Sequence, residues 1–320
     1  MTVSYLEFER PVAELENKIS EMKAIAQQDT SMDVAEEVRS LEEKAETLLR
    51  KIYDNLEPWQ TTQVARHPNR PHFLDYTRAL LEDFIPLAGD RMFAEDAAVL
   101  GGPARFRGRS VMMIGFEKGH DTETRMHHNF GMARPEGYRK AIRLMNMAER
   151  FNMPVIVMVD TPGAYPGKGA EERGTAEAIA RCIDRCLSLS TPNVSIVVGE
   201  GGSGGAVAVA TTNRVLMLEH SIYTVASPEA SASILWRVAD KAHDAAAAMK
   251  ITAQNLLDLG VIDKIIPEPV GGAHRSPAGT MANVGDAIEK MLVDLSDASP
   301  ASLRAARREK YIQIGRTGFA

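Results

Sequence analysis

The spacing of apolar residues divides the 320-residue chain into a helical N-terminal segment and a longer region in which helices and strands alternate. In the first segment the apolar residues that recur every three or four positions are Leu15, Ile19, Met22 and Ile25 or Ala26, then Val34, Val38, Leu41, Ala45, Leu48 and Ile52. This period predicts two amphipathic helices. The polar residues 28–33 separate them, and Ser31 or Asp33 is the expected N-cap of the second helix. We therefore expect a helical hairpin arm over residues 1–65. Because two helices alone bury little apolar surface, we expect its seam to pack on a partner subunit or on the rest of the chain.

Prolines and a change of composition near residues 60–70 mark the boundary to a second unit, residues 66–320. Here the expected helices cover residues 73–84, 136–151, 170–189, 206–212, 229–239, 241–249, 253–259 and 282–295. The expected strands cover residues 97–100, 109–116, 155–159, 194–198, 214–218 and 261–266. Runs such as Val155-Ile156-Val157-Met158-Val159 are apolar at every position, which is typical of strands buried on both faces. The pattern predicts an α/β fold with a largely parallel sheet between helices.

Composition and charge narrow the possible functions. The formal charge of −6 gives no general electrostatic reason to bind nucleic acid, and no apolar run is long enough to span a membrane. The N-terminus lacks the pattern of a secretory leader, so we expect a cytoplasmic protein. Cys182 and Cys186 lie four residues apart, a spacing that fits neither a CxxC motif nor a zinc site, and we expect buried free thiols. A basic C-terminal helix is expected to face solvent or a partner; its cations are Arg304, Arg307, Arg308, Lys310 and Arg316.

Two glycine-rich segments, residues 160–167 and 199–206, follow the strands at 155–159 and 194–198. Ligands of open α/β sheets bind beyond the carboxyl ends of the strands, so these segments are the first place to look for chemistry. Glycines let backbone N–H groups approach a ligand closely, and a helix that starts directly afterwards adds positive partial charge. The two segments therefore predict an anion or oxyanion site.

The second segment admits three interpretations. Gly199, Gly201 and Gly204 satisfy G-x-G-x-x-G after a strand, and Glu219 lies where a ribose-binding acid would be expected, but the following helix is short and the motif lies mid-chain. A phosphate-binding P-loop is excluded because Ala206 stands where that motif needs lysine.

The third interpretation is an oxyanion hole. The N–H groups of Gly204 and Gly205, joined by those of Gly163 or Ala164, would point at a carbonyl oxygen that becomes negative.

Other candidate groups have weaker patterns. Ser203 in Gly-Gly-Ser-Gly-Gly resembles a nucleophile elbow, but no His and Asp partners are evident. His120, His127 and His128 have no zinc-binding spacing, and we expect surface or hydrogen-bonding roles for them. Glu229 opens a helix after Ser227-Pro228, where a carboxylate suits the helix dipole.

Six motifs in one order identify a resemblance: Asn129-Phe130-Gly131-Met132, residues 134–140 (RPEGYRK), 160–167 (DTPGAYPG), 199–206 (GEGGSGGA), Ser227-Pro228-Glu229 and 268–275 (EPVGGAHR). Together they resemble the family of carboxyltransferase alpha subunits of bacterial acetyl-CoA carboxylase, over nearly the whole chain. The resemblance implies a crotonase-like ββα superhelix with an N-terminal helical hairpin arm. It also implies a transferase that, with a beta subunit, moves the carboxyl group of carboxybiotin to acetyl-CoA, giving malonyl-CoA for fatty acid synthesis.

The resemblance further implies partners and site residues. The partners would be the beta subunit, which would carry a zinc ribbon and form an alpha2beta2 complex, the biotin carboxyl carrier protein that bears carboxybiotin, and biotin carboxylase; no metal is expected in this chain. Gly204 and Gly205 match the family's glycine pair that holds the biotin ureido carbonyl.

We expect further residues on the carboxybiotin side of the site, namely Gly201, Gly202, Ser203, Tyr165 and Glu229. In the family the ureido nitrogen can take the acetyl proton, which would explain the lack of an evident general base. Lys168 departs from the apolar residue expected there. The alternatives are a crotonase-type acyl-CoA hydratase or isomerase, for which only Glu200 or Glu229 could supply the carboxylates, and a non-catalytic scaffold subunit.

Overall fold

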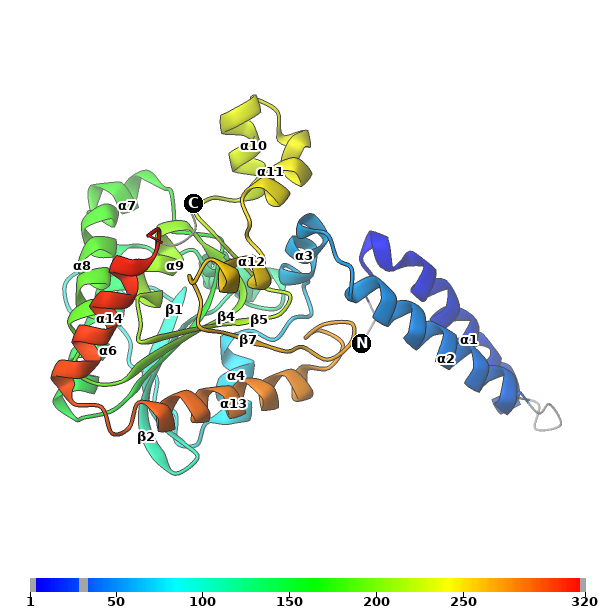
Figure 1. The fold of residues 1–320 in the computed structure, drawn as a ribbon, viewed down its shortest axis with the longest axis horizontal. Helices are drawn as coiled ribbons and strands as arrows, with labels where there is room; N and C mark the ends of the chain where they lie inside the picture. Colours follow the sequence, from blue (N-terminus) through cyan, green and yellow to red (C-terminus); the bar gives the residue numbers. More distant parts are fainter. Residues whose placement is uncertain (1–3, 29–33, 317–320) are drawn as a thin grey trace.

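A computed structural model describes residues 4–28 and 34–316, and Figure 1 shows a helical arm projecting from a body built on one sheet. After a 3-10 helix (Glu7–Glu9), α1 (Arg10–Gln28) and α2 (Ala35–Tyr53) form the predicted hairpin. Ile19 and Leu41 are buried between these two helices, together with Val38 and Ala45. The outer part of the seam is thus covered by the hairpin itself, whereas its root, with Leu48 and Ile52, packs on the rest of the chain, as expected. The proposed N-caps Ser31 and Asp33 lie outside the described residues.

The root of the arm is attached to the body by both apolar and charged contacts. Val12, Leu49 and Tyr53 form a small core with Val64 of α3 (Pro58–Ala65). The Arg275 guanidinium lies 2.8 Å from a Glu16 carboxylate oxygen of α1. Helix α3 was not expected, because we interpreted Pro58 as the end of the helical pattern. Proline is nevertheless compatible with the first turn of a helix, where its missing N–H costs nothing.

Within the described ranges the sheet has seven strands, in the order β1-β2-β3-β4-β5-β7, and β6 pairs with the end of β4. The strands are β1 (Val99–Phe106), β2 (Arg109–Phe116), β3 (Val155–Thr161), β4 (Asn193–Gly202), β5 (Arg214–Leu218), β6 (Ile222–Thr224) and β7 (Lys264–Ile266). β1 and β2 form an antiparallel hairpin, while the pairs from β2 onward are parallel. The predicted parallel sheet is thus confirmed, with one antiparallel edge strand added.

Two apolar cores lie on opposite faces of this sheet. On one face Ile114 and Val157 pack with α6 (Pro135–Arg150), α8 (Thr175–Ser188) and α9 (Ser203–Ala210). On the other face Met113 and Ile156 pack with α4 (Phe73–Leu80) and α13 (Pro277–Asp294). Adjacent strand residues point to opposite faces, which is why strands buried on both sides are apolar throughout.

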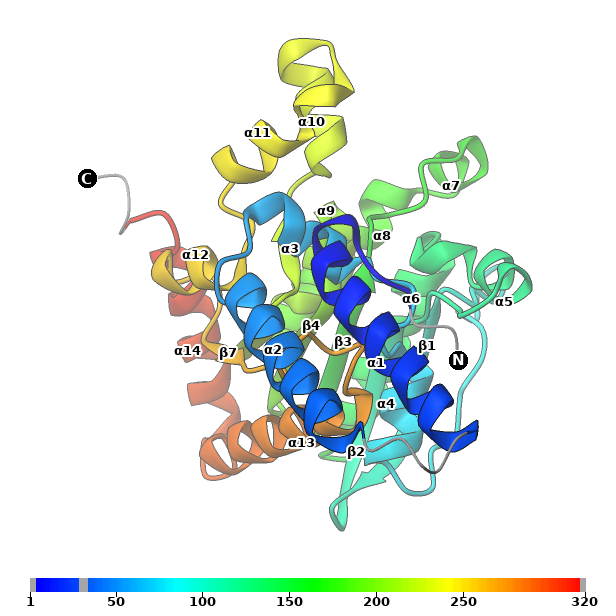
Figure 2. The same ribbon diagram turned by 90° about the vertical axis from the view of Figure 1, so that its right-hand side faces the viewer.

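The remaining helices correct several expected boundaries. They are α5 (Thr122–His127), α7 (Lys168–Glu172), α10 (Pro228–Trp236), α11 (Ala242–Ala248), α12 (Ala253–Asp258) and α14 (Pro300–Gln313), with 3-10 turns at Asn129–Gly131 and Ala239–Lys241. The helix expected over 170–189 is two helices, because Gly174 between them has a left-handed φ of +79°. Seen from the side in Figure 2, α10 and α11 stand away from the body.

The C-terminal segment has its predicted role only in part: Arg304, Arg308 and Arg316 are exposed, as expected, whereas Arg307 is not. Arg307 is buried and donates hydrogen bonds to the carbonyl oxygens of Cys186 and Leu189, both at 2.8 Å, at the end of α8. Its charge therefore caps a helix inside the protein rather than facing solvent. Cys182 and Cys186 are buried free thiols, as expected. None of the described helices is long and apolar enough to cross a membrane.

Candidate functional site

The two glycine segments meet at the carboxyl ends of β3 and β4. The segment 199–206 was expected to be a loop. Instead β4 continues through Gly202, and α9 begins at the next residue. Ser203, with φ +53°, makes the sharp turn between them. A Cβ at Gly202 would lie 2.3 Å from the carbonyl of Pro162, and the close approach of the two segments therefore requires glycine.

The first turn of α9 packs directly on the other segment. A Cβ at Gly205 would lie 2.8 Å from the Gly163 carbonyl carbon and 2.9 Å from the Ala164 nitrogen, whereas a Cβ at Gly204 would only touch Ile179 at 3.7 Å. The Gly163 segment is held in place by Thr161, whose hydroxyl accepts from the Gly163 N–H (3.1 Å) and donates to its carbonyl (2.9 Å). No side chain caps α9. Its first N–H groups, which have no partner inside the helix, are thus available to an anion or oxyanion.

Tyr165 and Lys168 lie at the edge of this turn. The Tyr165 ring packs under the Arg134 guanidinium, 4.8 Å from the ring centroid, and its N–H donates to the carbonyl of Ala133. Lys168 is exposed and pairs with Glu172 at 3.5 Å. Tyr165 is therefore fixed at the rim of the site, while Lys168 faces solvent.

Glu229 has a different partner from the one its sequence position suggests. Ser227 caps α10 by accepting from the Ala230 N–H, and the Glu229 carboxylate instead accepts from Arg66 at 2.5 Å. The same guanidinium donates to Glu200 at 2.6 Å. Burial alone would raise the pKa of Glu229, but its bond to Arg66 holds that pKa below the ordinary value.

A buried ion cluster, which the sequence interpretation missed, joins the ends of β3 and β4. The Lys118 ammonium lies 2.7 Å from an Asp160 oxygen and 2.9 Å from a Glu200 oxygen, and Asp160 also accepts from the Glu200 N–H at 2.9 Å. Burial would raise the pKa of Asp160, but the Lys118 charge outweighs it and the pKa lies well below its usual range. The two carboxylates likewise raise the pKa of Lys118 despite its desolvation. The cluster therefore stays ionised at neutral pH and holds together the strands that lead into the two glycine segments.

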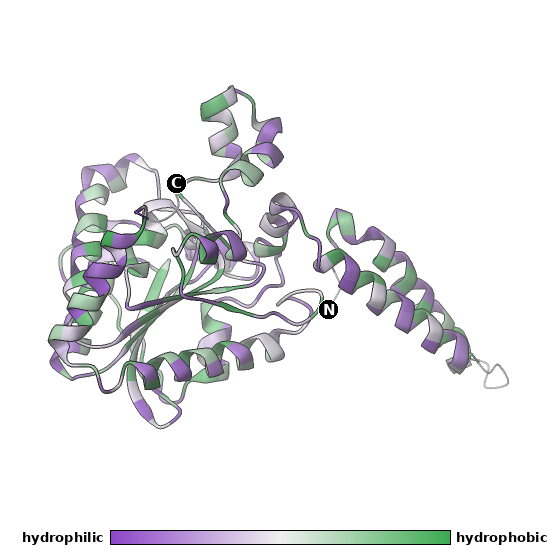
Figure 3. Ribbon diagram, in the orientation of Figure 1, coloured by the Kyte–Doolittle hydropathy of each residue, from purple (hydrophilic) through white to green (hydrophobic). Residues whose placement is uncertain are grey.

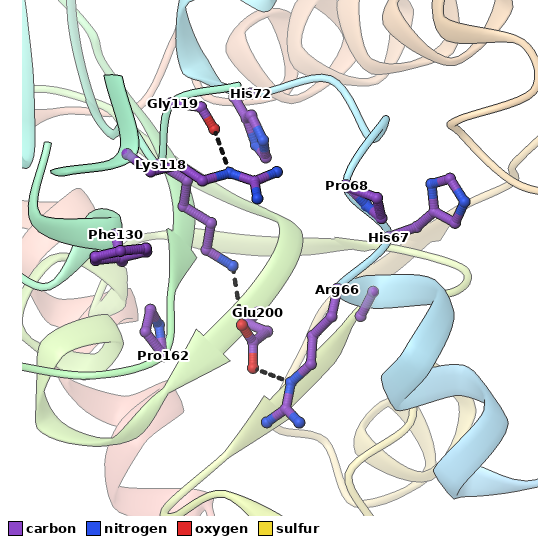
Figure 4. A pocket seen from close by; sticks show the side chains of 11 residues that line it. Arg66, His67, Pro68, His72, Lys118, Gly119, Phe130, Pro162 and Glu200 are labelled. Atoms are coloured by element: carbon purple, nitrogen blue, oxygen red, sulfur yellow. Dashed lines mark hydrogen bonds and ion pairs between the residues drawn. The ribbon is translucent and has the colours of Figure 1, made fainter. Parts of the chain in front are cut away.

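A cavity of about 420 Å³ opens beside the cluster, as Figure 4 shows. Its walls come from the α3–α4 connection, from the segment after β2 and from Pro162 of the first glycine segment. Apart from two histidines, the charged side chains that line it are Arg66, Lys118, Arg125 and Glu200. The cavity thus adjoins the glycine turns at the carboxyl edge of the sheet.

The other candidate groups have structural roles. His120 lies 2.9 Å from Asp75, and His128 lies 2.6 Å from the carbonyl oxygen of Ala97, which confirms the hydrogen-bonding role expected for both. His127 contacts the His128 ring edge-on. Across the described ranges no group of three His, Cys, Asp or Glu side chains is placed to hold a metal ion.

Neither of the rival motifs finds its partners. In the described part of the chain Ser203 makes no hydrogen bond to a histidine or carboxylate, as a nucleophile would need. Glu219 accepts from the Glu268 N–H at 3.0 Å instead of facing the glycine turn. The arrangement therefore supports neither a hydrolase triad nor a dinucleotide site.

Comparison with known proteins gives matches over nearly the whole chain. A family model described as acetyl co-enzyme A carboxylase carboxyltransferase-like matches residues 5–315. The acetyl-coenzyme A carboxylase carboxyl transferase subunit alpha of Parvibaculum lavamentivorans is 61% identical over 317 residues, which is 99% of each chain. The subunit of the same name from Agrobacterium fabrum is 58% identical over 313 residues, covering 98% of this chain and 99% of the relative.

Solved structures show the same fold at low identity. A Pseudomonas malonate decarboxylase hetero-tetramer in complex with coenzyme A contains a chain with a TM-score of 0.61 and 18% identity, over 76% of this chain and 96% of that one. Transcarboxylase 12S gives a TM-score of 0.57 at 18% identity, over 71% of this chain and 42% of that one. The body therefore has the crotonase-like fold that the resemblance implied. Since the family model and the relatives both extend over almost the full length, the chain belongs to the family of acetyl-CoA carboxylase carboxyltransferase alpha subunits.

Proposed function

We propose that the paired glycine turns of this carboxyltransferase subunit are the oxyanion-binding half of an active site that a beta subunit completes. The reaction is transfer of the carboxyl group from carboxybiotin, borne by a carrier protein, to acetyl-CoA. The observation that supports the location is the contact of Gly205 with Gly163 and Ala164 at the uncapped start of α9.

The residues present fit a ureido carbonyl. Carboxybiotin supplies the carboxyl group. When that group leaves, negative charge remains on the ureido oxygen. The N–H groups of Gly204 and Gly205 lie in the first turn of α9, where the helix dipole adds to their positive charge. One such preorganised donor contributes about 3–4 kcal/mol to catalysis in enzymes where it has been removed. On the opposite segment Ala164 is the candidate for a further donor, because the Gly163 N–H already donates to the Thr161 hydroxyl.

The ion cluster maintains this geometry. Asp160 lies three residues before Gly163, and Glu200 lies three residues before Ser203, where α9 begins. Both carboxylates bind Lys118. Donors positioned before the reaction need no reorganisation during it, which is the source of their catalytic effect.

The alternative, a hydratase or isomerase, is disfavoured by the state of its two candidate carboxylates. Such an enzyme needs carboxylates free to exchange protons with a substrate. Glu200 is bound by Lys118 and Arg66, and Glu229 is bound by Arg66. Burial would raise the pKa of Glu200, but the charges of Lys118 and Arg66 lower it overall, so the residue is held ionised and paired.

A second chain is needed because transfer creates two oxyanions, one on the ureido oxygen and one on the thioester enolate. We propose that the beta subunit, carrying the zinc ribbon, supplies the donors for the thioester in an alpha2beta2 complex served by the biotin carrier and biotin carboxylase. Helix α10 and the segment before it offer a surface: Ile234 and Leu235 on α10 are 76% and 66% exposed, and Val225 ahead of the helix is 82% exposed. Figure 3 shows apolar segments on this projecting helix, whose Glu229 is bound to Arg66 at the edge of the cavity.

The experiment that separates the two functions uses the chain with its beta partner and two assays. We expect malonyl-CoA formation from a carboxybiotin donor and no hydration of a 2-enoyl-CoA. Hydration by the chain without a partner would instead favour the acyl-CoA hydratase.

A further inference from the structure

The cavity beside Pro162 contains a cation that the ion cluster does not use. Arg66 and Lys118 are both bound to Glu200. Arg125 forms no ion pair with any described residue, and its Nε–H donates only to the carbonyl oxygen of Gly119, at 3.4 Å. A guanidinium carries five N–H donors. Most of those of Arg125 therefore remain available at the wall of the cavity.

The aromatic wall of the same cavity is held by an unusual backbone. Asn129, Phe130 and Gly131 all have left-handed φ values, of 49°, 55° and 77°. For the first two residues this conformation costs free energy, and such strain tends to occur at binding sites. The Asn129 amide donates to the Met132 carbonyl at 2.7 Å and stabilises the turn. The result is that the Phe130 ring stays 48% exposed at the cavity instead of joining the core.

The arrangement indicates the chemical class of the ligand. Guanidinium groups bind carboxylate and phosphate in a bidentate manner. Arg66 and Lys118 are already paired with carboxylates, so Arg125 is the one lining cation without an ion pair among the described residues. A single free guanidinium balances one negative charge, which fits a carboxylate better than a doubly charged phosphate. Phe130 and Pro162 lie on the same side of the cavity in Figure 4 and offer an apolar wall to the body of a small acid. The volume of about 420 Å³ is within the range of small-molecule sites.

We infer that this cavity is a carboxylate subsite, in which Arg125 binds the carboxyl group of the carboxylated substrate and Phe130 packs against the atoms that carry it. The identity of the substrate rests on the proposed function: carboxybiotin and malonyl-CoA each carry a carboxylate that biotin and acetyl-CoA lack. The subsite would therefore distinguish carboxylated from uncarboxylated forms next to the glycine turns. Arg125 is a specificity-determining residue in this account.

The first test measures binding to the full chain without any partner. Ligand-observed NMR titration compares malonamate, a monocarboxylate like the malonyl end, with uncharged malonamide and with inorganic phosphate. We expect malonamate to bind and the other two to bind at least about tenfold more weakly, the scale of a lost charge-assisted hydrogen bond. Equal binding of malonamide and malonamate, or preference for phosphate, would overturn the carboxylate assignment without any substitution being made.

Variants locate the site. Arg125→Gln should weaken malonamate binding at least about tenfold, and Arg125→Lys, which keeps the charge but loses the planar fork, should weaken it less. The matched control is Arg109→Gln, an exposed arginine at the other end of β2, which should bind malonamate as the wild type does. Wild-type binding by Arg125→Gln contradicts the proposal, and a thermal melt of each variant verifies that it is folded.

The assembled enzyme then identifies the source of the carboxylate. If it is the malonyl group, Arg125→Gln raises the KM for malonyl-CoA in the reverse reaction; if it is carboxybiotin, the variant raises the KM for the carboxybiotin donor. An unchanged KM for both overturns the subsite. Absence of any transfer by the wild-type complex would refute the proposed function, while the NMR titration would still decide the subsite.

Discussion

A methyl group at position 205 has no room, since its carbon would lie 2.8 Å from the Gly163 carbonyl carbon and 3.1 Å from the Tyr138 hydroxyl. We predict that Gly205→Ala lowers kcat at least about a hundredfold, because the added carbon forces apart the two segments that carry the donors. Gly204→Ala is the matched control, since its Cβ meets only Ile179 at 3.7 Å, and the amide donor is retained. Steady-state carboxyl transfer by the two variants, each paired with the beta subunit, measures the difference; equal rates would argue against this geometry.

His274 makes stability depend on pH. Its ring stacks on His67 with centroids 3.8 Å apart, and neither ring nitrogen has a hydrogen-bond partner among the described residues. Burial, followed by the nearby charges of His67, Arg70 and Arg275, lowers its pKa to about 3, although Glu268 acts in the opposite direction. The unfolded chain, with an ordinary histidine pKa of about 6.5, therefore binds a proton that the folded chain does not.

The sign follows from that difference. The full stability is present above the unfolded pKa, and stability falls as the pH drops from about 6.5 toward 3. We predict that His274→Phe loses less stability than the wild type between pH 7 and about 4.5, while His67, whose pKa is also lowered by burial, keeps part of the slope in both proteins. Urea unfolding at several pH values measures this, and parallel curves for the two proteins would exclude the effect.

Some residues of the candidate site could be predicted from the sequence, and others could not. Gly163, Ala164, Gly204 and Gly205 belong to local segments that follow apolar strands, and the structure brings them together. The ion-pair partners of Glu200 could not be predicted from the local sequence, because Arg66 lies 134 positions away and Lys118 lies 82 positions away. Lys118, Asp160 and Glu200 do each follow a predicted strand, and that shared position was the one signal available.

For the helices and strands, the spacing of apolar residues predicted which elements exist better than it predicted where each begins and ends. The strand expected at 194–198 extends to Gly202, because β6 pairs with its glycines and the neighbouring segments pack closely on them. Tertiary pairing here overrides the low strand preference of glycine. The buried Arg307 was misassigned for a related reason, since a helix end that needs a cation cannot be recognised from the residues around the arginine. The division at residues 65 and 66 stays a prediction.

Helix α10 should be the element that contacts the beta subunit. We predict that Ile234→Ser combined with Leu235→Ser weakens assembly with that subunit at least about tenfold, since two exposed apolar side chains would no longer be buried there. Because both are exposed in the isolated chain, its melting temperature should not change. Val293→Ser, on α13 and 53% exposed, is the matched control. Normal assembly of the double variant in a sedimentation titration would place the contact elsewhere.

At the scale of the whole molecule, one sheet places the site at its carboxyl edge and two projections extend beyond the body. Figures 1 and 2 show the α1–α2 arm and the α10–α11 pair leaving the body in different directions. The arm buries its seam within the hairpin and, at its root, against the body, whereas α10 keeps apolar residues exposed. The one set of oxyanion donors that we propose lies at the start of α9, although the reaction creates two oxyanions. We therefore propose that the chain supplies half of an active site.

We infer that this half-site is inactive alone, and a titration of the purified chain with the beta subunit measures this most directly. Malonyl-CoA formation from a carboxybiotin donor is followed at fixed chain concentration. We predict no turnover by the chain alone and activity that rises until one beta subunit is present per chain, because only then do both donor sets face each other. Substantial turnover by the chain without its partner would contradict the account and indicate a self-sufficient enzyme.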